Sequence, residues 1–519
     1  MGRAALGLVA LDHPERGAER QGDPARPMKP FKDHEAARQR HDEHPARDSV
    51  HRSSLLVPEL PGAEAEIAFL NHFLVKRGYD RVACRITSID AQGEKIRTAL
   101  HMLREPRVHR FALSHMAQGA ASHLVEFFAA ENLVVPFPAV MINHEGPGFL
   151  NTVHAFNRVL NDVFEDDAVN AIQTPEASID VEAGAETFVV FMAGAERCRG
   201  ALEFELATPR GVRAAAVELD VPRLCPRVIA LREVFADPRD RRPGVLRIRQ
   251  PRQPMFYGRL LAGRRSDDAF TANHSYYDSS ASHEYWNDDE ESWRTYPMFD
   301  GLQTIVRMYP VMSPGRLATS IEVNDRRGRA LARSETWEIE SPGARFLDID
   351  LSRVLASRGV AATDTATFTV RARPVSGRAP TRINHQLLYG RGGLFASINV
   401  SLRHRSMFVP NGKTGFVWGQ IPVGGGIHPH IGIVASTPGG PACDVQVTLY
   451  DETGPRASRT QHLVPNGAIA LDAGDFEPDS IDRRSSSIWY VAHGSRPDLC
   501  GFTVSRHAQS GHSSGEHSF

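Results

Sequence analysis

The chain has 519 residues, with 60 Lys and Arg against 62 Asp and Glu, and 41% of its residues are hydrophobic. At ordinary domain sizes this length implies roughly three to five domains. The net charge of −2 provides no basic excess, which excludes nucleic acid and anionic membranes as electrostatically bound partners. No apolar run reaches the ~18 residues of a membrane span. The N-terminus makes a poor signal peptide, so we expect a cytoplasmic protein.

Residues 1–54 are rich in Arg, Asp, Glu and His and carry almost no periodic apolar pattern. Such a segment buries too little surface to offset its ordering entropy, which predicts a disordered tail. Met28 is an alternative start to Met1. The five cysteines are scattered and never spaced C-x-x-C, which argues against a disulfide framework and a Cys-based zinc site and predicts buried, free thiols.

A fourfold internal repeat dominates the chain from Leu60 onward. Each copy has an apolar strand, a second strand with period-two alternation, and a turn with Gly in its fourth position. The first strands are predicted at 67–74, 188–192, 305–309 and 431–434, and the turns at 90–93, 208–211, 325–328 and 451–454. Asp or Thr at the first position of each turn caps it, and Gly adopts the left-handed conformation that closes a hairpin.

After each turn the chain has a further strand and then a proline, at Pro106, Pro222, Pro342 and Pro465. Short alternating strands with frequent turn signals are typical of β-sandwiches. We therefore predict a mainly β protein of four tandem β-sandwich units, at 58–150, 180–280, 300–390 and 400–510. Minor helices are expected at 120–131 and, from the apolar spacing, at 150–164.

Each unit ends on an alternating strand that finishes at a histidine. This order of strand pair, turn, proline-containing strand and His-bearing strand resembles the sensory-rhodopsin transducer proteins. In the fourth unit, residues 414–422 are similar to that family's opening aromatic strand. The resemblance implies a non-enzymatic sandwich that self-associates, here as a homo-oligomer, and that binds small molecules such as sugars.

The segment at 274–299, which joins units two and three, is rich in aromatic and acidic residues. Aromatic faces stack on sugars, and neighbouring polar groups hydrogen-bond to hydroxyls, so this composition suits a polar small molecule or glycan. The candidate ligand-binding residues are Tyr276, Tyr277, Asp278, His283, Glu284, Tyr285, Trp286 and Trp293. The alternative interpretation is a long loop whose aromatic residues anchor it to the adjoining sandwiches.

The four strand-end histidines are candidate metal ligands: His144, His274, His385 and His507. If the units packed around a pseudo-symmetry axis, these imidazoles could converge on a divalent transition metal. Alternatively, each one caps a turn within its own unit. His512, Glu516 and His517 form a second candidate cluster, although the surrounding Gly and Ser indicate a flexible end.

The first functional hypothesis is a non-catalytic protein that binds a polar, carbohydrate-like ligand or a protein partner. The alternative is a metal-dependent enzyme acting on a glycan or small polar substrate, with the strand-end histidines as ligands and Glu284 or Asp278 as base. A third hypothesis is a scaffold whose sandwiches pair edge to edge. Because no nucleotide-binding, zinc-protease or serine-hydrolase motif occurs in the sequence, we assign no catalytic residue and no definite cofactor.

Overall fold

The computed structural model describes residues 53–519 except 131–137, 160–175, 182–184, 237–243, 254, 267–268, 276–284, 287–290, 309–314, 342–345, 378, 381, 393, 405–413 and 472–486. Over these residues the protein is mainly β, as predicted, with antiparallel sheets that pair into four sandwiches and a few short helices. The predicted tail lies outside the described residues apart from Ser53 and Ser54, which begin the first strand. No described helix is long and apolar enough to cross a membrane.

The elements follow one another in a repeated order. Unit one contains β1 (Ser53–Pro58), β2 (Glu64–Leu70), α2 (His72–Arg77), β3 (Val82–Asp90), β4 (Lys95–Leu103), β5 (Val108–Ala112), η1 (Leu113–His115), β6 (Ala120–Ala129), β7 (Met141–Gly146) and β8 (Phe149–His154), followed by β9 (Asn157–Val159). Unit two contains β10 (Glu176–Val181), β11 (Glu186–Met192), β12 (Cys198–Thr208), β13 (Gly211–Val221), β14 (Pro226–Ala230), α4 (Leu231–Val234), β15 (Gly244–Arg249), β16 (Met255–Gly258), β17 (Leu261–Arg265) and β18 (Phe270–His274), followed by β19 (Tyr285–Trp286).

The second half of the chain repeats this order. Unit three contains β20 (Ser292–Pro297), β21 (Gln303–Met308), β22 (Gly315–Asp325), β23 (Ala330–Arg333), β24 (Trp337–Ser341), β25 (Leu347–Asp350), α5 (Leu351–Ala356), η3 (Ala362–Asp364), β26 (Thr365–Gly377), β27 (Ala379–Pro380), β28 (Arg382–Gly390) and β29 (Ala396–His404). Unit four contains β30 (Gly415–Pro422), β31 (Ile427–Ala435), β32 (Cys443–Asp451), β33 (Gly454–Leu463), β34 (Ala468–Leu471), β35 (Ser487–Gly494), β36 (Leu499–His507) and β37 (Ser513–His517).

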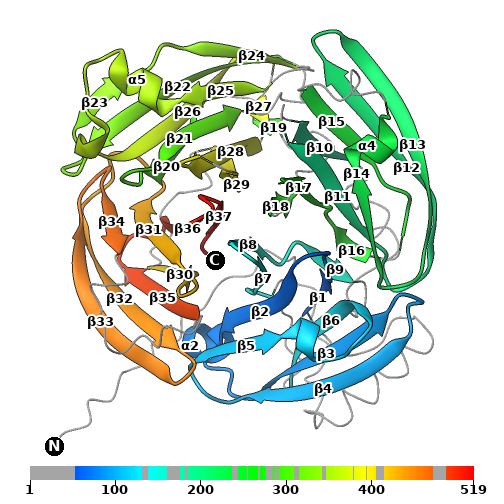
Figure 1. Ribbon diagram of the computed structural model, residues 1–519. Coiled ribbons are helices and arrows are strands. Elements are labelled where there is room, and N and C mark those ends of the chain that lie inside the picture. The colour runs from blue at the N-terminus through cyan, green and yellow to red at the C-terminus, as the bar shows by residue number, and fades with distance from the viewer. Residues whose placement is uncertain are drawn as a thin grey trace, which may run out of the picture.

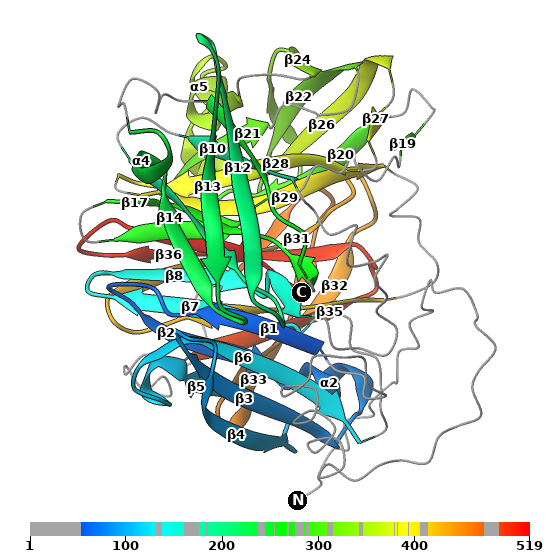
Figure 2. The ribbon, with the colours of Figure 1, turned by 90° about the vertical axis from the view of Figure 1, so that its right-hand side faces the viewer.

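The four units share one topology. Their outer sheets have the orders β1-β6-β3-β4, β10-β15-β12-β13, β20-β26-β22-β23 and β30-β35-β32-β33. Their inner sheets have the orders β5-β2-β7-β8, β14-β11-β17-β18, β25-β21-β28-β29 and β34-β31-β36-β37. In unit three the two sheets join through β20 and β29. The units close into a ring with the inner sheets toward its centre (Figure 1), and a second view shows the sandwiches from the side (Figure 2).

Several sequence predictions fail where burial hides the strand pattern. The helices expected at 120–131 and 150–164 are wrong over their described residues, which form β6, β8 and β9. Residues 131 and 160–164 lie outside the described part of the chain. β6 and β8 are covered on both faces, so their apolar residues do not alternate as in a half-exposed strand. For the same reason β1 was not predicted, since all six of its residues are buried. Strands also extend beyond the expected limits of the units, for example to His154 in unit one and His517 in unit four.

The predicted hairpin turns are confirmed. Asp90 Oδ1 accepts hydrogen bonds from the backbone N–H groups of Gln92 and Glu94, at 2.9 and 2.8 Å. Asp325 and Asp451 cap their turns in the same way. The glycines in the fourth position all have positive φ, from 76° at Gly328 to 123° at Gly211. These turns therefore form as the sequence requires.

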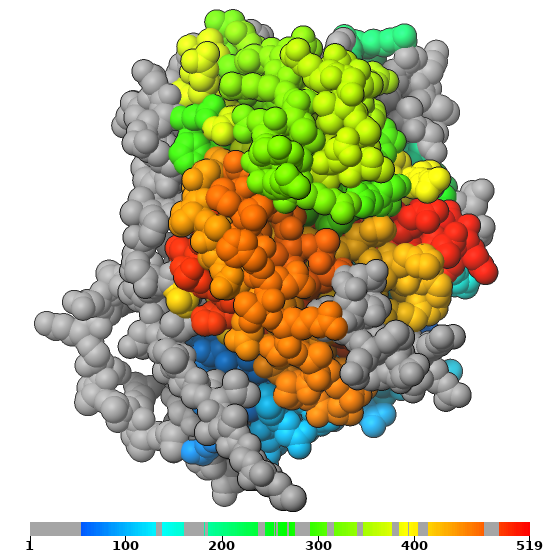
Figure 3. Space-filling model, turned by 90° about the vertical axis from the view of Figure 1, so that its left-hand side faces the viewer, coloured from blue at the N-terminus to red at the C-terminus, as the bar shows by residue number. Residues whose placement is uncertain are grey.

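The same turns also join neighbouring units. Arg223 Nε of unit two donates to the carbonyl of Gly93 in unit one, at 3.1 Å. Asn466 Nδ2 of unit four donates to the carbonyl of Gly328 in unit three, at 3.5 Å. Arg107 Nη1 of unit one donates to the carbonyl of Glu452 in unit four, at 3.1 Å. In each case a turn of one unit packs against the proline-containing loop of the next, and the last unit meets the first. Figure 3 shows unit four lying between units three and one.

Gly328 gives a direct test of these junctions. Its φ is +76°, and a Cβ built on it would overlap the carbonyl of Pro465 in the next unit. Gly301 has the same φ with nothing within 4 Å of such a Cβ. We expect Gly301→Ala to cost about 1 kcal/mol, the ordinary price of a left-handed alanine, and Gly328→Ala to cost roughly twice that. Urea unfolding of both variants measures the difference, and equal losses would contradict the proposed contact.

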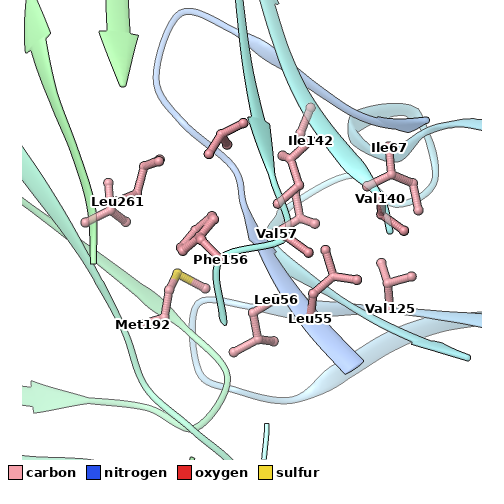
Figure 4. Packing of buried hydrophobic residues seen from close by; sticks show 14 of the residues in the cluster. Leu55, Leu56, Val57, Ile67, Val125, Val140, Ile142, Phe156, Met192 and Leu261 are labelled. Atoms are coloured by element: carbon pink, nitrogen blue, oxygen red, sulfur yellow. The ribbon is translucent and has the colours of Figure 1, made fainter. Parts of the chain in front are cut away.

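Apolar packing continues across the unit boundaries. One cluster of buried residues includes Leu56 and Val57 of unit one together with Met192 and Leu261 of unit two. Figure 4 shows Phe156 between these two pairs. Burial of a side chain of this size contributes about 1.5–3 kcal/mol to the stability of the fold. Neighbouring units therefore stabilise each other through a shared apolar core. The five cysteines, all within the described residues, are buried and free, as predicted.

Candidate functional site

Four strands meet at the centre of the ring, namely β8, β18, β29 and β37 (Figure 1). Each is the innermost strand of its inner sheet, and β8, β18 and β37 are edge strands whose outer backbone groups need partners. Side chains of neighbouring units supply them. Asn151 Oδ1 accepts from the N–H of Ala272 at 2.7 Å, and Asn273 Nδ2 donates to the carbonyl of Ser397 at 2.8 Å.

The same kind of contact closes the ring between the first and last units. Ser514 Oγ accepts from the N–H of Thr152 at 2.8 Å. Glu516 Oε2 accepts from the N–H of His154 at 3.2 Å. Both bonds join residues 362 positions apart in the chain. The axis is therefore a polar, hydrogen-bonded core. A substitution of one of these side chains in one unit would remove a hydrogen bond to the edge strand of another unit.

A cluster of two histidines and one carboxylate lies in this core. His154, Glu516 and His517 each offer a ligand atom, and these atoms all lie within 4.8 Å of one another. His154 Nδ1 is 3.0 Å from Glu516 Oε2, and His517 Nε2 is 3.7 Å from Glu516 Oε1. The exposed fractions of the three side chains are 13%, 2% and 28% in chain order. Among the described residues, this is the cluster of three His, Cys, Asp or Glu side chains close enough to hold a metal ion.

Burial and the neighbouring charges determine the protonation of this cluster. Burial raises the pKa of Glu516, but His154 and His517 outweigh this effect and bring it to about 2. Burial lowers the pKa of His517 to about 4. At neutral pH the cluster therefore contains an ionised carboxylate beside a neutral His517.

A small pocket reaches the cluster from the boundary between units one and four. Its lining residues include Thr152 of unit one and Gln420, Ser514, Glu516 and His517 of unit four. The pocket has room for about one water molecule. It suits a water or an ion and is too small for a sugar ring.

The four strand-end histidines do not converge. His144 Nε2 lies 3.0 Å from the carbonyl of Pro58, and His385 Nε2 lies 2.7 Å from the hydroxyl of Tyr296. His507 is partly exposed at the end of β36, and of the four only His274 lies at the axis, where its ring is 4.7 Å from that of His154. The prediction is wrong because His144, His385 and His507 lie on β7, β28 and β36, each one strand away from the innermost strand of its sheet, whereas His274 lies on the innermost strand β18.

The aromatic junction is described only in part. Tyr276, Tyr277, Asp278, His283 and Glu284 lie outside the described residues. Tyr285 and Trp286 form β19, which pairs with Pro380 and Ala379 of β27 in unit three. Trp293 lies in β20, opposite Arg371 and partly buried. Whether these residues hold a ligand stays a prediction.

The cluster that forms includes residues of a segment for which the sequence predicts a flexible end. Gly and Ser around His512, Glu516 and His517 suggested a flexible end, but residues Ser513–His517 form β37 and are almost completely buried. Small residues are needed here because four strands approach one axis, and a Cβ on Gly515 would lie 3.1 Å from Ile398 Cδ1 on β29 of unit three. Gly and Ser can therefore indicate close packing as well as flexibility. His512 takes another role, since its Nε2 lies 2.7 Å from the carbonyl of Phe270.

Comparisons with known proteins add little to this picture. A scan of protein-family models gives no match, and no curated protein matches the chain. One solved structure that matches is a crystal structure of a tetra-tandem repeat in the extending region of a large adhesion protein, with 11% identity over 85% of this chain and 90% of that chain. Its TM-score is 0.11, so this likeness carries no argument about fold or function.

Proposed function

We propose that this tandem β-sandwich protein is non-catalytic and binds a polar, carbohydrate-like ligand or a protein partner on a rigid ring. The observation that carries the proposal is the attachment of the aromatic junction to the frame. The junction leaves β18 at the buried His274, pairs through Tyr285 and Trp286 with unit three, and enters the sheet again at Ser292. Recognition segments positioned by a rigid scaffold are a common arrangement for binding.

Two further points support this proposal over the enzyme alternative. The alternative depended on four converging histidines, and His144 and His385 instead hydrogen-bond within their own surroundings. The proposed likeness to the self-associating sensory-rhodopsin transducer sandwiches also fits a chain whose four units associate with one another. A cytoplasmic location remains part of this proposal and agrees with five free, buried thiols.

A glycan array followed by calorimetry tests the proposal. Trp286→Ala and Trp293→Ala should each weaken binding of the best glycan about fivefold, because a stacked aromatic contributes on the order of 1 kcal/mol. Trp337→Ala is the matched control, since Trp337 is a partly exposed tryptophan on β24, three strands across the sheet from Ser292 and outside the 274–299 segment. No glycan bound above background, or equal affinity in all three variants, would contradict a carbohydrate-like ligand at the junction.

A further inference from the structure

We propose that His154, Glu516 and His517 bind one divalent transition-metal ion, which links the first and last units at the centre of the ring. The proposal is independent of the glycan hypothesis, because the junction residues take no part in it. β8 supplies His154, and β37 supplies the other two ligands. The ion would thus connect two strands that are 362 positions apart in the chain.

The donor geometry fits a bound ion. Two ligand atoms that each lie about 2.1 Å from a tetrahedral metal are about 3.4 Å apart. His154 Nδ1 lies 3.0 Å from Glu516 Oε2, and His517 Nε2 lies 3.7 Å from the other oxygen, Oε1. One ligand atom from each residue lies within 4.8 Å of the other two, so small side-chain shifts would bring all three to an ion. His154 Nδ1 is buried and is out of line for a hydrogen bond despite its closeness to Glu516. This nitrogen therefore has a close contact with a carboxylate oxygen in place of the well-aligned hydrogen bond that burial normally requires.

The backbone around His517 sets the tautomer that a metal ligand needs. His517 Nδ1 lies 2.9 Å from the carbonyl oxygen of Ser518. A carbonyl can only accept, so Nδ1 carries the proton and Nε2 keeps its lone pair, directed toward the cluster. Metal-binding histidines commonly donate their second N–H to a carbonyl in this way.

The buried carboxylate of Glu516 also favours a bound cation. Its carboxylate is 2% exposed, and its ion pairs among the described residues are with His154 and His517. Backbone N–H groups of His154 and His517 donate to it, and Asn273 Nδ2 approaches to 3.5 Å. A divalent ion would balance this buried carboxylate more directly than hydrogen bonds alone.

His274 lies beside the cluster without joining it. Arg259 Nη1 is 3.2 Å from His274 Nε2, and a guanidinium can only donate. The lone pair of Nε2 is therefore occupied, and Nδ1 donates to the carbonyl of Ser275 at 3.0 Å. Three protein ligands leave a fourth position, which the adjoining pocket can fill with a water. Two imidazoles and one carboxylate suit Zn²⁺, Co²⁺ or Ni²⁺.

Titration of the tag-free full chain with Co²⁺, followed by its visible absorption, tests the site. We expect one Co²⁺ per chain with the spectrum of a four-coordinate ion, and an affinity at least about tenfold lower in Glu516→Gln and in His517→Gln. His507→Gln is the control and should bind as the parent does. The histidines of the N-terminal segment are common to all variants, so their weak binding cancels in the comparison.

Thermal melting in EDTA shows first that each variant folds. If Glu516→Gln does not fold, because an amide nitrogen replaces one of its two acceptor oxygens, His517→Gln decides the result, since His517 is more exposed. Three results would each overturn the proposal. The parent and the variants could bind Co²⁺ with equal affinity, the parent could fail to take up one Co²⁺ per chain, or His507→Gln could lose as much Co²⁺ affinity as the other variants.

Discussion

Lowering the pH from about 6.5 to about 4 should destabilise the protein strongly. Burial lowers the pKa of His72 and His385 to about 3 and that of His512 to about 4. In the unfolded chain these groups titrate near 6.5. Between the folded and the unfolded pKa, the histidine is protonated in the unfolded chain but neutral in the folded chain. The free energy of unfolding is therefore largest above about pH 6.5 and falls as the pH decreases. Each of these histidines contributes up to about 3 kcal/mol to this loss.

His72→Phe tests the origin of this pH dependence. His72 lies at the contact between units one and four, where its ring stacks on Trp418 with centroids 5.4 Å apart. Phenylalanine keeps this stacking and removes the titratable group. The melting temperature of the variant should therefore fall less than that of the parent as the pH is lowered. His462→Gln is the control, because His462 is exposed beside Asp444. A melting temperature that is unchanged between about pH 6.5 and 4.5 would refute the buried, neutral histidines.

Arg85→Met should destabilise the chain by about 3–5 kcal/mol, the usual cost of leaving one partner of a buried ion pair without the other. Arg85 and Glu126 face each other on β3 and β6, and both side chains are completely buried. Arg85 Nε and Nη2 donate to Glu126 Oε2 at 2.8 and 2.6 Å. Methionine fills much of the space and provides no charge.

The double variant Arg85→Met with Glu126→Leu separates loss of charge pairing from loss of packing. Replacing both partners by apolar residues is often close to neutral, so the double variant should recover most of the stability. Urea unfolding at neutral pH measures all three proteins. If the double variant is less stable than Arg85→Met alone, the buried charge is not the cause of the loss.

The fold class followed from the sequence because turn chemistry is local. An Asp at the start of a turn and a Gly at its end, as at 90–93, require the same geometry wherever the hairpin lies. Four copies of this signal were enough to predict four sandwiches. Predictions failed for strands covered on both sides, such as β6 and β8, since their side chains show no alternation between core and solvent.

The site could not be predicted in the same way, because it depends on how distant units pack. His154 and His517 are far apart in sequence, and nothing local to either residue indicates the other. The strand-end histidines carried a visible pattern, but the pattern placed His144 and His274 on non-equivalent strands. A repeated motif thus predicted the repeated unit correctly and the convergence of its residues incorrectly.

Crosslinking of unit one to unit four tests most directly whether the four sandwiches close into a ring. Arg107 and Glu452 are exposed partners across that boundary, and the native thiols are buried. A short bismaleimide should therefore join Arg107→Cys to Glu452→Cys within one chain, as detected by mass spectrometry. Arg107→Cys with Arg358→Cys, on the opposite side of the ring, should remain unlinked. Failure of the first pair to crosslink, or equal crosslinking of both pairs, would contradict the closed ring.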